Sequence, residues 1–135
     1  MGQQQVLLLV FGMFVVGIAI YMGIDILESK TRQIHADLLM SYAVQVSSQA
    51  TAWRTKETQL IGGGQDYSEL NIDGMEVLAL DEDWPPGMVK ITYASADSLV
   101  ITAVSNHYDD VGVRVHVSGI HIVRTSVAFD GTITF

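Results

Sequence analysis

The longest run of apolar residues in the sequence lies near the N-terminus. From Val6 to Ile24 the chain reads VLLLVFGMFVVGIAIYMGI, which contains no charged side chain and no amide. A helix of this length covers roughly 28 Å at ~1.5 Å per residue, close to the ~30 Å hydrocarbon core of a bilayer. Because the stretch is apolar on every side, it predicts a transmembrane or protein-buried helix over residues 3–25. The preceding MGQQQ has none of the basic residues that begin a secretory signal peptide.

The helical pattern continues beyond this membrane-length stretch. No Pro or Gly occurs from Asp25 to Lys56, so we expect one uninterrupted helix over residues 1–57. Gly62-Gly63-Gly64 predicts that the helix ends before a Gly-rich loop at 58–74. Apolar residues at three- to four-residue spacing alternate with polar ones, as on an amphipathic helix packed on one side. The apolar positions are Ile34, Leu38, Met40, Val44, Val46 and Trp53, and the polar ones Gln33, Asp37, Gln45 and Gln49.

Residues 75–135 have the pattern of antiparallel strands. Short runs rich in Val, Ile, Thr and Tyr are separated by turn residues. The clearest is 111–117, where four valines alternate with Gly112, Arg114 and His116, so that one face is buried. Ala96-Asp97 and Asp130-Gly131 are predicted hairpin turns, and the chain is expected to end in a strand. Strands are predicted at 75–80, 88–95, 98–105, 111–117, 120–127 and 131–135.

A sheet of this size needs a cover on one face, and the amphipathic half of the helix is available for it. The predicted fold class is therefore α+β, with a long N-terminal helix whose second half packs on a C-terminal antiparallel sheet, the β-rich head at 75–135. Trp53 is assigned to the helix–sheet core. Trp84, which precedes Pro85-Pro86-Gly87, either packs on its own sheet or contacts a neighbouring subunit or a sugar.

Composition narrows the function classes. The 15 acidic and 7 basic residues give a net charge of −8, and the basic residues are scattered singly. Nucleic-acid binding needs clustered Lys and Arg, so no nucleic-acid partner is expected. The absence of cysteine excludes disulfides and thiolate chemistry. No GxSxG elbow or phosphate-binding loop occurs, and we expect the chain not to be an enzyme.

Two groups of residues are candidate metal ligands. Acidic residues on loops suit calcium, but no EF-hand spacing is present and solvated loop acids are the preferred interpretation, so no cofactor is expected. These acids are Asp66, Glu69, Asp73, Asp81, Glu82 and Asp83, and proximity of Asp109 and Asp110 would strengthen a calcium site. His107, His116 and His121 are interpreted as exposed histidines in preference to a metal site.

The uncharged helix, its amphipathic continuation, the Gly-rich loop and the β-rich head together resemble the type IV pilins and pseudopilins. The resemblance implies a structural subunit that sits in the inner membrane before assembly and then polymerises with copies of itself into an extracellular, cell-surface helical filament. The family carries a basic leader ending in Gly, then Phe, and a Glu at the fifth mature position. Here Gly2 is the leader-like glycine, and cleavage after it would place Gln3 first and Leu7 fifth. Alternatives are a minor pseudopilin of a secretion machine and a single-pass, membrane-anchored binding module.

The resemblance assigns filament-core packing to the apolar half of the helix. Gly12, Gly17 and Gly23 would permit close approach of neighbouring helices. Asp25 either anchors the helix at the membrane interface or pairs with a cation of a neighbouring subunit, in place of the family's Glu. The residues assigned to core packing are Val6, Leu7, Leu8, Leu9, Val10, Phe11, Gly12, Phe14, Gly17, Ile18, Ile20, Gly23 and Ile24.

Overall fold

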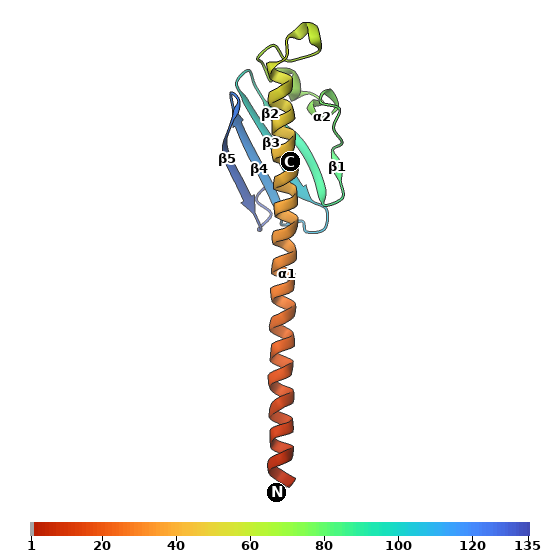
Figure 1. The fold of residues 1–135 in the computed structure, drawn as a ribbon, viewed down its shortest axis with the longest axis vertical. Coiled ribbons are helices and arrows are strands. Elements are labelled where there is room, and N and C mark those ends of the chain that lie inside the picture. The colour runs from red at the N-terminus through yellow and green to blue at the C-terminus, as the bar shows by residue number, and fades with distance from the viewer. Residues whose placement is uncertain (1) are drawn as a thin grey trace. The chain divides into compact units, whose positions relative to one another are not determined.

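The structure is a computed structural model that describes residues 2–135. The chain divides into two compact units, an N-terminal unit that ends at Gln33 and a C-terminal unit from Ile34 to Phe135. Helix α1, Gly2–Thr55, contributes to both units and confirms the predicted long helix. In the C-terminal unit, the second half of α1 lies on a five-stranded antiparallel sheet, so the predicted α+β fold class is confirmed (Figure 1).

The buried face of α1 repeats at alternating spacings of three and four residues. Every second residue of this buried face is an alanine, and these small side chains let the helix approach the sheet closely. Ile34 and Val44, which the sequence pattern assigned to this face, are instead 56% and 36% exposed, and Leu38 is 42% exposed. The prediction was wrong for these three residues because it placed the large apolar residues on the buried face, where the helix has alanines. The buried residues are Ala36, Leu39, Ala43, Val46, Ala50 and Trp53, together with Ser47.

The sheet is a meander in which each strand pairs with the next along the chain (Figure 1). Val113, Val115 and Val117 are buried while Arg114 and His116 are half-exposed, which confirms the predicted alternation. Ala96-Asp97 lies in the turn between β2 and β3, as predicted. The strands are β1 (Asp83–Trp84), β2 (Gly87–Ala94), β3 (Ser98–Ser105), β4 (Gly112–Ser118) and β5 (His121–Ala128).

Two predicted strands are wrong. Residues 75–80 fall in helix α2 (Gly74–Val77) and the turn after it, where Leu78 N–H donates to Gly74 O at 3.1 Å. MEVLAL is rich in good helix formers, and this local preference prevails. Residues 131–135 are not a strand either, and Asp130-Gly131 is not a hairpin turn. Gly131 has φ +73 and donates its N–H to Asp110 O at 3.0 Å, which directs the chain away from β5.

The connector between α1 and the sheet is folded closely against the end of α1. It contains two short 3-10 helices, η1 (Thr58–Leu60) and η2 (Ser68–Asn71), so the predicted loop at 58–74 is partly helical. Tyr67 and Leu70 are fully buried. A Cβ on Gly63 would lie 2.5 Å from the Trp53 ring, which explains why a glycine is needed where the loop crosses α1. The short 3-10 turns and buried side chains thus fix the connector in place.

Candidate functional site

The apolar surface of the N-terminal unit is the first candidate for function. The large apolar side chains from Val6 to Ile24 are 46% to 77% exposed. α1 is long and apolar enough to cross a membrane, by length and composition. Free energy falls when such side chains leave water, by about 1.5–3 kcal/mol for each one fully buried. This surface therefore favours contact with lipid or with another protein.

The glycines assigned to close helix approach lie on this surface. An added Cβ at Gly12, Gly17 or Gly23 would meet nothing within 4 Å. Around Gly17 the helix surface is shallowly concave, and this depression extends to Asp25. All the residues assigned to filament-core packing belong to α1, and their contacts with other copies stay a prediction. The depression is lined by Val10, Met13, Phe14, Gly17, Ile18, Tyr21, Met22 and Asp25.

Asp25 carries the first charge after the apolar stretch. It makes no ion pair with any residue in the range 2–135, whereas the next turn contains an ion pair between Glu28 and Arg32 at 3.1 Å. An i,i+4 pair of this kind on an exposed helix contributes only about 0.3–0.5 kcal/mol. Asp25 is therefore left with its charge available to an external partner, and the neighbour-pairing hypothesis stays a prediction.

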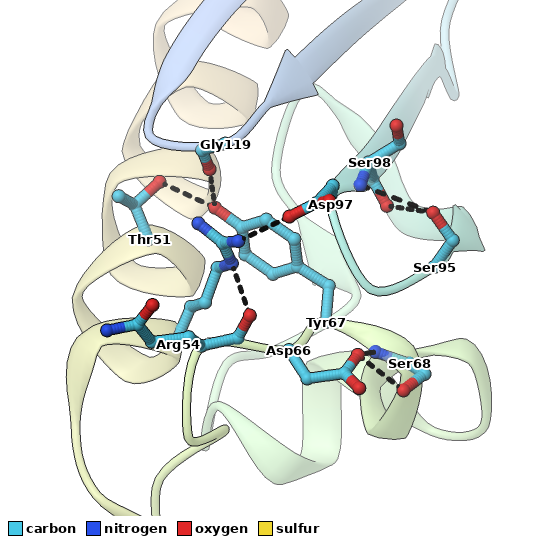
Figure 2. Close-up of polar contacts among 10 residues, drawn as sticks. Thr51, Arg54, Asp66, Tyr67, Ser68, Ser95, Asp97, Ser98 and Gly119 are labelled. Carbon is cyan, nitrogen blue, oxygen red and sulfur yellow. Dashed lines mark hydrogen bonds and ion pairs between the residues drawn. The ribbon is translucent and has the colours of Figure 1, made fainter.

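A polar clasp joins α1, the connector and two turns of the sheet, and we define it as Thr51, Arg54, Tyr67, Asp97 and Gly119. Figure 2 shows the buried Tyr67 ring between them. Its hydroxyl donates to Gly119 O at 2.7 Å and lies 3.2 Å from the Thr51 hydroxyl. Arg54 Nη2 donates to Asp97 Oδ1 at 2.7 Å, and the guanidinium lies 5.0 Å from the Tyr67 ring centroid. The sequence pattern did not single out this clasp, because its members lie far apart along the chain.

The acidic loop residues take part in turns. Asp66 Oδ1 accepts hydrogen bonds from the Ser68 hydroxyl and backbone N–H, which lower the pKa of the Asp66 carboxyl. Glu82 lies 3.6 Å from Lys90 Nζ. Within residues 2–135, no three or more His, Asp or Glu side chains come together in a way that could hold a metal ion.

The three predicted histidines do not form one group. His116 lies on β4 opposite Arg124, and His121 is exposed at the start of β5. His107 lies in the loop after β3, where its ring centroid is 5.1 Å from that of His35 on α1. The sequence analysis missed His35, whose Nδ1 is buried without a hydrogen-bond partner among the described residues. This pair lies at the helix–sheet boundary and contributes to packing there.

Both tryptophans pack within their own chain. Trp53 is 7% exposed and belongs to the core, as predicted. Trp84 stacks on Tyr42 of α1, with ring centroids 4.8 Å apart and an interplanar angle of 15°. Trp84 was predicted to pack against its own sheet, and its stacking partner belongs instead to the helix. The Tyr42 hydroxyl also donates to Asp81 O at 3.1 Å, which fixes the loop before β1.

No protein-family model, curated protein or solved structure matches the chain. Two exposed apolar surfaces have no cover within the described chain: the outer side of α1 and the outer strand β5.

Proposed function

We propose that the chain is a structural subunit of a helical, pilin-like filament on the cell surface, inserted in the inner membrane before assembly. Copies associate through the apolar side of α1, and the sheet-bearing C-terminal units form the outside. The observation that carries the proposal is the exposure of Ile34 and Leu38, 56% and 42%, on the opposite side of α1 from its sheet-packed face. Both residues lie beyond the membrane-length stretch, so lipid is not available to cover them.

A repeat along α1 supports the same conclusion. Val6, Met13, Ile20, Leu27 and Ile34 follow one another at seven-residue intervals, and each is at least 56% exposed. A seven-residue apolar repeat is the spacing at which helices associate side by side. Since the uncharged stretch ends at Ile24, the repeat continues for more than two turns past it. A simple membrane anchor has no use for this continuation, whereas a bundle of subunit helices does.

The experiment compares filament yield for the wild-type chain and for a variant with Ile34→Gln and Leu38→Gln. Sheared cell-surface material is imaged by negative-stain microscopy with antibody against the C-terminal unit. We expect labelled filaments from the wild type and few or none from the variant, because buried glutamines would oppose helix association. The matched control is Ile72→Gln, an apolar position that is 76% exposed and lies outside α1, which should leave the yield unchanged.

The alternatives give different outcomes in the same experiment. A membrane-anchored binding module yields no filaments from the wild type, and all of the protein stays with the membrane fraction. A minor pseudopilin yields antibody label at rare positions or at filament ends, in place of continuous label. Either result would replace the proposal of a major filament subunit.

A further inference from the structure

Charge is segregated between the two sides of the C-terminal unit. Residues 57–83, which lead into β1, contain eight acidic residues and no basic one. Residues 111–128, which form β4 and β5, contain two arginines and two histidines and no acidic residue. β1 and β5 are the two outer strands of one sheet. Because β1 carries Asp83 and directly follows Asp81 and Glu82, whereas β5 carries Arg124 and no acid, one edge of the sheet is acidic and the other is basic.

The basic edge is also apolar. Along β5, Val123 is 67% exposed, and Ile122 and Val127 are 43% and 44% exposed. Strand pairing is irregular at Val123, because His116 is opposite Arg124 and Val117 is opposite Ile122. Such a bulge interrupts the free row of backbone groups, so side chains will dominate contacts at this edge. Arg124 is exposed and forms no ion pair with any of the residues described.

The acidic edge carries unpaired charge as well. Asp81 and Asp83 are exposed and, unlike Glu82, have no cationic side chain within ion-pair distance among residues 2–135. Trp84, stacked on Tyr42, is half-exposed and offers aromatic surface beside Asp83. The edge therefore presents negative charge next to an aromatic ring, whereas the β5 edge presents positive charge next to aliphatic side chains.

We infer that the β5 edge of one copy docks against the β1 edge of the next copy in the filament, with Arg124 facing Asp81 and Asp83. This inference rests on the proposed function and identifies the contact between the outer units. Two β5 edges would bring arginines together and two β1 edges would bring acids together, so contacts between unlike edges are favoured. A contact between two different surfaces leaves both surfaces free at the ends, and such contacts generate open helical polymers.

The absence of cysteine allows a direct test by crosslinking. The full-length chain with Val123→Cys and Pro85→Cys, which leaves Asp81 and Asp83 in place, is treated, in sheared filaments, with a short bismaleimide. We expect a ladder of dimers, trimers and longer species. Each single-cysteine variant should stay monomeric, and a mixture of the two should give dimers only, because only unlike edges meet. Adding Arg124→Glu to the double-cysteine chain should weaken the ladder by about tenfold or more, since like charges would then face each other.

Microscopy of the same samples separates failure of this contact from failure of the proposed function. Filaments without a crosslinked ladder would overturn the edge contact and leave the filament proposal standing. Dimers from Val123→Cys alone would overturn it in favour of a symmetric β5 contact. Wild-type samples without filaments, together with no ladder from the double-cysteine chain, would overturn both. Because Val123, Pro85 and Arg124 are all exposed, near-UV circular dichroism should be unchanged in every variant.

Discussion

Removal of the Tyr67 hydroxyl is the sharpest test of how the C-terminal unit is held together. Tyr67→Phe keeps the buried ring and removes the donor to Gly119 O and the contact with the Thr51 hydroxyl. A net hydrogen bond contributes about 0.5–1.5 kcal/mol, and a buried acceptor left without a donor costs about 1–3 kcal/mol. Gly119 is half-exposed, so water can reach its carbonyl and the cost falls in the lower part of this range. We expect the free energy of unfolding to drop by about 1–2 kcal/mol.

The assay is urea unfolding of the full-length chain in detergent micelles, followed by the fluorescence of Trp53 and Trp84, which both pack in the C-terminal unit. Tyr93→Phe is the matched control, because Tyr93 is 52% exposed and should change the free energy of unfolding by less than about 0.5 kcal/mol. Combining Tyr67→Phe with Thr51→Val measures the coupling between the two hydroxyls. If Tyr67→Phe unfolds at the same urea concentration as the wild type, the clasp does not stabilise the unit and the argument fails.

Three further predictions concern packing and charge. Gly87→Ala places a Cβ 2.9 Å from Leu39 Cδ2 and closer still to a β3 carbonyl, so thermal melting should fall by several degrees; an unchanged melting temperature would contradict this packing. Ala43→Leu overfills the helix–sheet contact and should cost about 1–3 kcal/mol in urea unfolding, with a neutral result refuting the buried assignment. Ser68→Ala should raise the pKa of the Asp66 carboxyl toward its ordinary value in an NMR titration. Because the pKa of Asp66 is depressed in the folded chain, its ionised carboxylate stabilises the fold above the unfolded pKa of about 3.9, and this stabilisation is lost as pH falls through the folded value. The free energy of unfolding should therefore fall less with acid in Ser68→Ala than in the wild type. An identical fall in both would count against the turn.

Much of the fold follows from local pattern. The absence of Pro and Gly over Asp25 to Lys56 was sufficient to predict the continuous helix, and valine alternation was sufficient to predict β4. These features depend on periodicity within one element, which neighbouring residues specify directly. The failures at 75–80 and 131–135 have another origin. In these two segments the apolar residues are buried from short turns and not from strands. Ile133, for example, is buried beside Gly112 without strand pairing.

The clasp and the helix face could not be predicted in the same way. Tyr67 reaches Gly119 across 52 residues of sequence, and no local spacing links the two. The C-terminal half of α1 has apolar residues on two sides, and periodicity alone does not say which side meets the sheet. Small residues decide it, because alanines at 36, 43 and 50 let the backbone approach the strands, while larger Ile34 and Leu38 face outward.

The same division would allow one chain both to fold and to assemble into the proposed filament. Folding of the C-terminal unit uses the alanine side of α1, so assembly through Ile34 and Leu38 does not compete with it for the same surface. The edge charges act on a different step: screened by salt over ~8–10 Å, they select which outer surfaces meet. Raising ionic strength should therefore weaken contacts between Arg124 and Asp83 while leaving the apolar helix contacts intact. Filaments would then loosen on the outside before they dissociate.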